Sequence, residues 1–275
     1  MKSVSEMTMT ELQDNIGILS TPSKMAGTSW SISAALCLVG GVLKHIAGSV
    51  CSSCYAERGQ YIFPSFKKAA ARRWRKMRYA ISFESSRERF ISSFSELLTR
   101  KRIATEKRIA EGKKVSCDAR YHRWFDAGDL QPGMLPIICE IGRRCPEVQM
   151  WLPTREWQMV IDEIDGGLEI PINIAIRISA HWPNFNPIYS TRLIAAGCYL
   201  SGVHTEKGSI PDTMGGEDWS FFECPAHRQD NACDGDLLEC RACYACAAPG
   251  HKTIAGKTAV SYPLHGFIFA ILMAL

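Results

Sequence analysis

Twelve cysteines are the residues of this 275-residue chain with the clearest capacity for chemistry. Three of them, Cys37, Cys51 and Cys54, follow the pattern C-x13-C-x2-C-Y. Thiolates in such a set can hold a four-iron, four-sulfur (4Fe-4S) cluster and leave one iron open for a substrate or for S-adenosylmethionine. A structural zinc ion with His45 as fourth ligand is one alternative. Reduced thiols that hold no metal are the other.

A second set of five cysteines lies close together near the carboxyl terminus. The pattern is C-x8-C-x6-C-x2-C-x2-C, made of Cys224, Cys233, Cys240, Cys243 and Cys246. Its C-x2-C-x2-C centre is more typical of a bacterial ferredoxin run than of a zinc ribbon, which has two separated pairs. We expect a second 4Fe-4S cluster or a zinc ion here, with His227 as a spare ligand.

The other four cysteines, Cys117, Cys139, Cys145 and Cys198, fall in or beside expected strands and a helix, so we expect them in the core. The first twenty residues lack the apolar segment of a secretory signal. We therefore expect a reducing cytoplasm, in which clustered cysteines bind metal more often than they form disulfides.

The charge of the chain is unevenly distributed. The formal net charge is +4, yet residues 67–114 contain sixteen Lys and Arg against five Asp and Glu. This predicts a nucleic-acid partner bound through basic helices at 64–114, and a solvated helical face is the alternative. Phe66, Trp74 and Tyr79 could stack on bases, although their helical spacing favours core positions.

The elements that must position these residues follow from the apolar pattern. Helices are expected from Pro64 and from about Ser86, and a first strand within residues 29–61, where Leu36 to Leu43 form an apolar run. After Gly112, β-like runs at 120–125, 148–153, 172–179 and 198–203 alternate with helical patterns at 134–145, 156–165 and 187–197. Strand, helix and strand at this spacing predict a parallel α/β sheet.

Ligand sites of parallel α/β sheets lie at the carboxyl ends of the strands. Eight polar residues occupy such ends: Asp126, Asp129, Thr154, Arg155, Ser179, His181, His204 and Thr205. For any one of them a turn or capping role is the alternative, and their shared edge is what favours a site.

The domain organisation follows from these patterns. We expect a flexible leader at 1–28 with at most one helical turn, an α/β core at 29–208, a cysteine-rich metal-binding appendage at 209–256, and a final strand with an apolar tail at 257–275. The ten apolar residues at the end are too few to span a bilayer, so no membrane partner is expected.

Seven segments resemble, in order, the phage gene product 88 family: SWSISAALC, CSSCYAERGQY, RWFDAGD, PINIAIRIS, CPAH, CRACYAC and VSYPLH. The resemblance covers roughly Ser29 to His265 and implies a phage context, hence the host-cell cytoplasm. Within it, the cysteine–tyrosine motif is similar to the cluster loop of radical S-adenosylmethionine enzymes, in which an aromatic residue follows the last cysteine. Those enzymes usually have C-x3-C-x2-C, so the gap of thirteen residues is a departure.

The similarity to radical S-adenosylmethionine enzymes implies a partial parallel β/α barrel. It also implies that Ala127 to Asp129 replace the Gly-Gly-Glu motif, with Asp129 binding the cofactor amino group. Arg123, Arg155 and Ser179 would then orient the cofactor carboxylate or the substrate. An external electron donor is a further partner that this chemistry requires.

The leading hypothesis is a radical S-adenosylmethionine-like enzyme acting on an unknown, nucleic-acid-related substrate. A non-catalytic zinc protein that binds nucleic acid or a host factor is the main alternative, and an iron–sulfur redox or sensor protein is the third. The chain contains no G-x4-G-K-[ST], G-x-S-x-G or H-E-x-x-H motif, which disfavours nucleotide hydrolases, serine hydrolases and zincin proteases.

Overall fold

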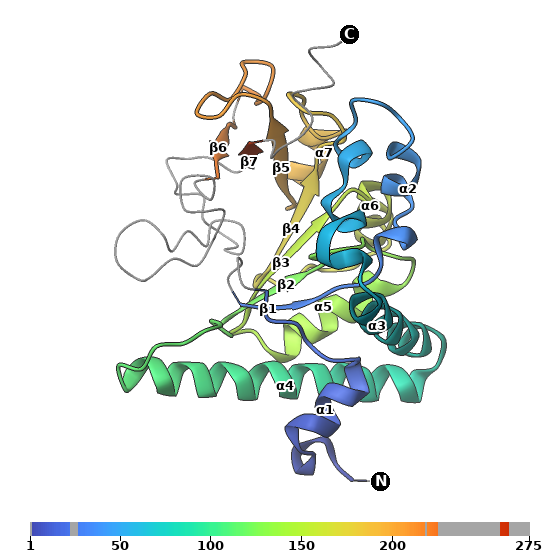
Figure 1. Cartoon of the computed structure of the whole chain (residues 1–275), viewed down its shortest axis with the longest axis vertical. Helices are drawn as coiled ribbons and strands as arrows, with labels where there is room; N and C mark the ends of the chain where they lie inside the picture. The colour runs from blue at the N-terminus through green and yellow to red at the C-terminus, as the bar shows by residue number, and fades with distance from the viewer. Residues whose placement is uncertain (1, 23–26, 218, 225–258, 264–275) are drawn as a thin grey trace.

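The computed structural model describes residues 2–22, 27–217, 219–224 and 259–263, and its strands form one parallel sheet (Figure 1). The order of the seven described strands is β1-β2-β3-β4-β5-β7-β6. Every neighbouring pair runs parallel. The strands are β1 (Thr28–Trp30), β2 (Tyr121–Trp124), β3 (Gln149–Thr154), β4 (Ile174–Ser179), β5 (Tyr199–His204), β6 (Phe221–Glu223) and β7 (Ala259–Pro263).

Helices make the connections between successive parallel strands. Those joining β1 to β2 are α3 (Pro64–Ser82) and α4 (Glu84–Ala110), followed along the chain by α5 (Met134–Arg144), α6 (Trp157–Asp165) and α7 (Ser190–Ala195). The alternation of strands and helices expected after Gly112 is therefore confirmed. The observed ends of these elements differ from the expected ones by up to three residues. In the described part of the chain β1 and β6 end the strand order and do not pair, so the sheet is open and not a closed barrel.

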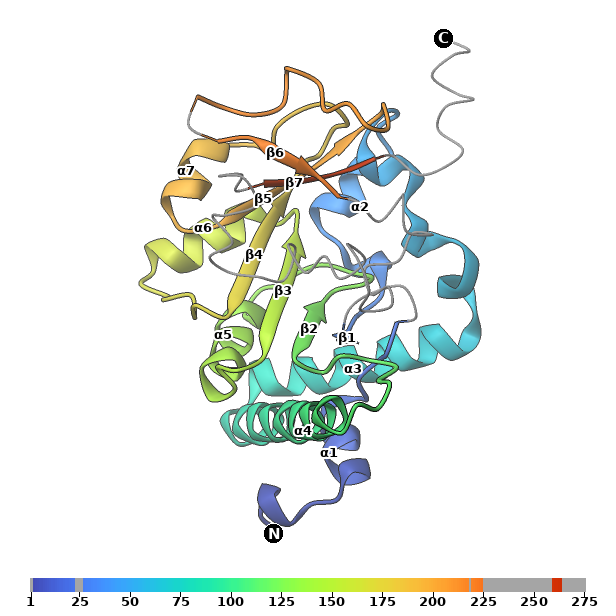
Figure 2. The ribbon, with the colours of Figure 1, turned by 90° about the vertical axis from the view of Figure 1, so that its left-hand side faces the viewer.

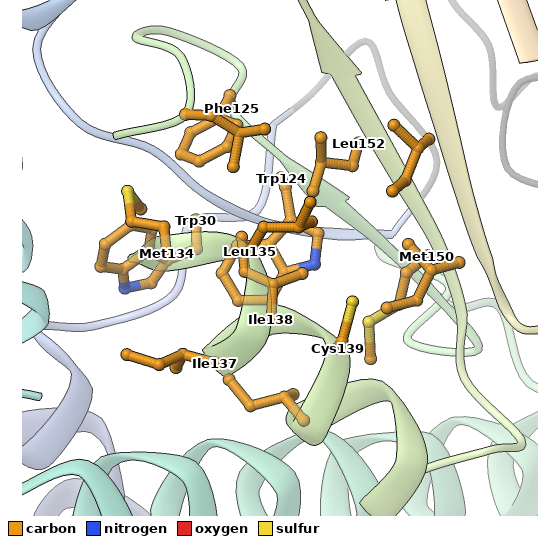
Figure 3. Packing of buried hydrophobic residues seen from close by; sticks show 14 of the residues in the cluster. Trp30, Trp124, Phe125, Met134, Leu135, Ile137, Ile138, Cys139, Met150 and Leu152 are labelled. Carbon is orange, nitrogen blue, oxygen red and sulfur yellow. The ribbon is translucent and has the colours of Figure 1, made fainter. Parts of the chain in front are cut away.

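The main core lies between the sheet and the helices (Figures 1 and 2). Side chains alternate along a strand, so Met150 and Leu152 of β3 face this core while Trp151 faces the opposite side of the sheet. Figure 3 shows Leu135 and Ile138 of α5 packed among these sheet residues. The helix side of the sheet is therefore apolar, and aromatic side chains lie on its other face.

The amino-terminal segment is part of the fold, unlike the flexible leader with at most one helical turn that its polar sequence suggested. It forms a 3-10 turn η1 (Val4–Glu6) and an eight-residue helix α1 (Met9–Ile16). Thr8 caps α1 by accepting a hydrogen bond from Glu11 N. Leu12 and Ile16, one turn apart, are fully buried, and the Ile16 carbonyl accepts a hydrogen bond from Trp30 Nε1 at 2.8 Å. Contact with α4 orders the segment, which a local pattern does not reveal.

The apolar run from Leu36 to Leu43 is helical and forms no strand. It contains η2 (Ala34–Leu36) and α2 (Val39–Leu43), and the first strand is β1, which precedes it. Leu38 and Val42 are exposed to solvent, so the run is only partly a core element. Apolar runs this short do not distinguish a strand from a helical turn, because both bury a few residues.

Much of the carboxyl-terminal region lies outside the described residues, including most of the expected appendage, Cys233, Cys240, Cys243 and Cys246, and the apolar tail. The expected final strand is confirmed as β7, which lies between β5 and β6. Cys139, Cys145 and Cys198 are buried as expected, and Cys117 is half-buried. None of the described helices is long and apolar enough to cross a membrane.

Candidate metal centre at the carboxyl edge of the sheet

Residues 31–63, which we call the cysteine loop, connect β1 to α3 and contain the three early cysteines. Besides η2 and α2, the loop is made of the short turns η3 (Val50–Ser53), η4 (Tyr55–Glu57) and η5 (Gly59–Ile62). Because it follows β1 directly, it begins at the carboxyl edge of the sheet. Cys37 ends η2, Cys51 lies in η3, and Cys54 follows η3.

Cys37 and Cys51 approach each other around Gly40. A Cβ atom on Gly40 would lie 3.1 Å from Cys37 Cβ and 3.5 Å from Cys51 Sγ, so glycine leaves the space into which both cysteines fit. Burial raises the pKa of both thiols, and the charges of Cys54 and of the neighbouring acids raise them further. Without a bound cation these thiols are therefore protonated at neutral pH.

In the described residues, no three His, Cys, Asp or Glu side chains are arranged so that a single metal ion could bind them. His45, the fourth zinc ligand considered from the sequence, is exposed on the cysteine loop. Cys51 is buried, while Cys37 and Cys54 are half-buried. The cysteines are thus gathered in one loop, without the compact ligand set of a single ion.

Glu156 attaches the cysteine loop to the end of β3. Its carboxylate Oε1 accepts hydrogen bonds from Leu38 N at 3.1 Å and Val39 N at 2.9 Å, at the start of α2 and next to Cys37. Only 3% of Glu156 is exposed, and burial together with the nearby Asp129 charge raises the pKa of its carboxyl to about 7. A buried acid thus stabilises the backbone beside the first cysteine.

The cysteine loop is also attached to the turn that follows β2. Tyr55, the residue after Cys54, donates its hydroxyl to Asp126 O at 2.6 Å, and Tyr61 donates to Asp126 Oδ2 at 2.8 Å. Gln131 Nε2 donates to Leu36 O at 2.8 Å. The first bond places the aromatic residue of the C-x2-C-Y motif against the turn after β2, and the other two attach further parts of the loop there.

A third attachment reaches the end of β4. Val50 N, next to Cys51, donates to His181 O at 2.9 Å. His181 is 7% exposed, and its Nε2 has no hydrogen-bond partner among the residues that the structure describes. Burial and the charge of Arg155 lower the pKa of this imidazole, so it is neutral at pH 7.

Asp129, expected to bind a cofactor amino group, is buried and bonded to its surroundings. Its Oδ1 accepts from Leu130 N at 2.8 Å and from Thr154 Oγ1 at 2.5 Å, and its Oδ2 accepts from Arg155 N at 3.0 Å. Burial raises the pKa of this carboxyl, although the three donors oppose the increase. Asp129 therefore joins the turn after β2 to the end of β3.

The other expected cofactor-binding residues lie along the same edge, and Arg123 also contacts the cysteine loop, with its Nη2 donating to Tyr55 Oη at 3.4 Å. Arg155 Nε donates to Ala180 O at 3.2 Å. Burial raises the pKa of Cys51, and the positive charge of Arg155 opposes this increase. The guanidinium of Arg123 lies 4.4 Å from the ring centre of Trp151, on the sheet face opposite the helices. Ser179 Oγ lies 2.9 Å from Ser201 Oγ.

Residues at the far strand ends are not part of this cluster. His204 is bonded to Ser261 Oγ at 2.7 Å and to Glu223 Oε1 at 3.1 Å, which connects β5, β7 and β6. Thr205 is bonded to Asn184. Cys224, the one late cysteine described, is buried against Trp151 and Val260 on the sheet face opposite the helices.

Sequence reasoning missed Glu156, Tyr61 and Arg177. Glu156 comes two residues after β3 ends, so the strand-end rule that selected Arg155 applied to it equally. Arg177 lies within β4, where an arginine in an isoleucine-rich strand was a signal. It is buried, with its guanidinium 5.1 Å from the ring centre of Tyr199.

The comparison with known protein families covers this edge of the sheet. The family model described as Gene product 88 matches residues 31–248, which include the cysteine loop and the ends of β2 to β5. The chain belongs to the gene product 88 family. Within this family of phage proteins, the matched span begins just after β1 and covers all twelve cysteines. No curated protein matches the chain, and no solved structure matches it.

Proposed function

We propose that this gene product 88 protein is a radical S-adenosylmethionine-like enzyme in which Cys37, Cys51 and Cys54 hold a 4Fe-4S cluster. The observation that carries the proposal is the cysteine loop: it follows β1 at the carboxyl edge of a parallel sheet and is attached there to the ends of β2, β3 and β4. A partial β/α barrel, formed by curvature of the same strand order, is part of the proposal.

The number of early cysteines favours a cluster over a single zinc ion at this loop. Structural zinc takes four ligands, with sulfurs at about 2.3 Å from the ion. No three candidate ligands in the described residues are gathered around such a point. A 4Fe-4S cluster binds each thiolate through a different iron, so its ligands are more widely spaced. Three cysteines also leave one iron without a protein ligand.

The bound cluster would supply the electron that cleaves the sulfonium of S-adenosylmethionine. The chain supplies the polar groups around it. Asp129 Oδ2 accepts one hydrogen bond, so it has a lone pair for an ammonium group. Arg155, at the end of β3, would supply positive charge for a carboxylate, and Arg123 and Ser179 would line the face on which a substrate would lie. Glu156 positions the backbone next to Cys37.

The test is anaerobic purification of the full chain, with iron, sulfide and zinc measured per chain and the visible spectrum recorded. We expect iron with matching sulfide, a charge-transfer absorbance, and reductive cleavage of added S-adenosylmethionine. Cys51→Ala should remove both the absorbance of this cluster and the cleavage. Cys139→Ala, which removes a core thiol on α5, is the matched control and should keep both.

Two outcomes would overturn the proposal. Zinc alone, after cluster reconstitution has also failed, would favour a non-catalytic zinc protein that binds nucleic acid or a host factor. Iron and sulfide without S-adenosylmethionine binding would favour an iron–sulfur redox or sensor protein. Normal cofactor cleavage by Cys51→Ala would exclude the cysteine loop as the cluster site.

The late cysteines and the cellular setting belong to the same proposal. Cys224, Cys233, Cys240, Cys243 and Cys246 would hold a second 4Fe-4S cluster or a zinc ion. The position of Cys224 beside Trp151 supports a place for this metal near the sheet face that carries Arg123. An electron donor in the host-cell cytoplasm would supply the reducing equivalents.

A further inference from the structure

The outer face of α3 carries a stripe of cations that form no ion pair with any described residue. Lys67, Lys68, Arg75 and Arg78 are exposed. They lie within an arc of about 100° of the helix surface at 3.6 residues per turn. None of the four forms a salt bridge within the described part of the chain, and α3 itself contains no acidic residue. The stripe is therefore an uncompensated positive surface.

The basic run on α4 differs from this stripe, although both have a similar composition. Arg100 pairs with Glu96 at 2.7 Å, and Arg102 pairs with Glu106 at 2.6 Å and also with Glu147. Arg100 and Arg102 are thus paired within the protein, and α4 contains four acidic residues of its own whereas α3 contains none. Both helices belong to one basic segment of the sequence, but in the structure they differ in how their cations pair with acids.

Aromatic side chains extend the stripe at the carboxyl end of α3. Tyr79 is 53% exposed and Phe83 is 55% exposed, and their rings stack with centres 6.0 Å apart. Trp74 packs against the core instead, and Phe66 packs against Tyr61. Removal of two such rings from water would be favourable, so their exposure beside unpaired cations indicates a surface that a partner covers.

We infer that the stripe Lys67, Lys68, Arg75 and Arg78, together with Tyr79 and Phe83, binds a single-stranded nucleic acid. Cations that follow a helix neutralise successive phosphates, and exposed aromatic rings stack on unpaired bases. A duplex hides its base faces, so the two rings specify a single strand. Helix α3 begins at Pro64, where the cysteine loop ends, so a nucleic-acid strand bound along the stripe would lead toward that loop. The inference does not depend on the cluster.

The test is fluorescence anisotropy of the full chain with a labelled twenty-nucleotide oligo-dT, over a series of salt concentrations. Arg75→Glu with Arg78→Glu should weaken binding at least tenfold and reduce the slope of log affinity against log salt by about 1.4, because each phosphate contact to a single strand contributes about 0.7. Lys107→Glu with Arg108→Glu changes the charge equally on exposed positions of α4 and should change affinity less than twofold.

A second pair of substitutions tests the aromatic part. Tyr79→Ala with Phe83→Ala should weaken binding about tenfold while leaving the salt slope unchanged, because stacking releases no counterions. Circular dichroism checks that each variant is folded, and Lys67→Gln with Lys68→Gln replaces the arginine pair if that pair is unfolded. Equal loss in the α4 control, equal affinity for a duplex of the same length, or binding to anionic lipid vesicles but not to oligo-dT would each overturn the inference.

Discussion

Gly128 shows how a single residue shapes the turn that carries Asp126 and Asp129. Its φ is +83°, and a Cβ there would lie 2.5 Å from Ile32 Cγ1 and 2.9 Å from Ile32 O. Phe125, earlier in the same turn, also has positive φ, at 57°. A bulky residue is rarely found there, so the turn stores strain at the proposed site.

We predict that Gly128→Ala lowers the free energy of unfolding by about 3 kcal/mol. The left-handed conformation costs an alanine about 1 kcal/mol, and the clash with Ile32 adds about 2 kcal/mol. Gly112→Ala is the control: its φ is +66° but no atom lies within 4 Å of a Cβ, so it should lose only about 1 kcal/mol. Urea denaturation measures both, and equal losses would show that the Ile32 contact has no energetic importance.

At the scale of elements, the position of α2 depends on an acid from another part of the chain. Leu38 and Glu156 are 118 residues apart, yet the Glu156 carboxylate accepts the first N–H groups of α2. Short helices of this kind are marginal alone, so their stability comes from such tertiary contacts. The connection links the cysteine loop directly to the sheet edge.

We predict that Glu156→Ala speeds amide hydrogen exchange at Leu38 and Val39 at least tenfold and destabilises the chain by about 2 kcal/mol, because two partly buried donors lose their acceptor. Glu156→Gln retains a carbonyl oxygen that can accept these bonds, so its exchange rates and its stability should be close to those of the parent protein. Hydrogen exchange followed by mass spectrometry measures the difference. Slow exchange retained in the alanine variant would show that other contacts hold α2.

On α3, too, the role of each arginine depends on the residues that surround it. The buried face of α3 includes Arg73, whose guanidinium donates to Ile18 O at 2.7 Å and to Ser20 Oγ at 2.6 Å. One arginine of the basic run thus secures the amino-terminal segment, while Arg75 and Arg78 face solvent. Helical periodicity predicts which arginines face the core and which face solvent. It does not predict which of them form ion pairs.

At the scale of the whole molecule, stability against acid depends on the buried histidines. His122 on β2 is almost fully buried beside Phe94 and Trp124, with its Nδ1 2.8 Å from Thr28 Oγ1. Burial lowers the pKa of this imidazole from 6.5 to about 3. The folded chain therefore binds fewer protons than the unfolded chain between these values, and this contribution to stability is present above pH 6.5 and is lost as the pH falls toward 3.

We predict that the stability difference between the parent protein and His122→Asn narrows by about 1.4 kcal/mol for each pH unit below 6.5. The asparagine keeps a polar partner for Thr28 but does not titrate. Unfolding by urea at pH 7, 6, 5 and 4 measures the difference, which is insensitive to the other titrating groups. A constant difference over this range would mean that His122 has the same pKa in the folded and unfolded chains.

The sequence by itself determined the parallel α/β arrangement, the helices from Pro64 and about Ser86, and the cysteine pattern at the start of the sheet. These features are local: strands and helices follow from the spacing of apolar side chains over a few residues, as in Ile174, Ile176 and Ile178 of β4. Cys37, Cys51 and Cys54 were found by spacing in the same way.

Only the tertiary structure decided how these parts meet. Glu156, His181 and Asp126 hold the cysteine loop through contacts between residues that are far apart in sequence, and no short pattern encodes such partners. The order of α1 came from burial of Leu12 and Ile16 against distant elements. Which arginines present an unpaired positive charge at the surface depends on which of them lie next to a carboxylate in the folded chain. Burial and pairing are properties of the folded chain, because they depend on what packs against each side chain.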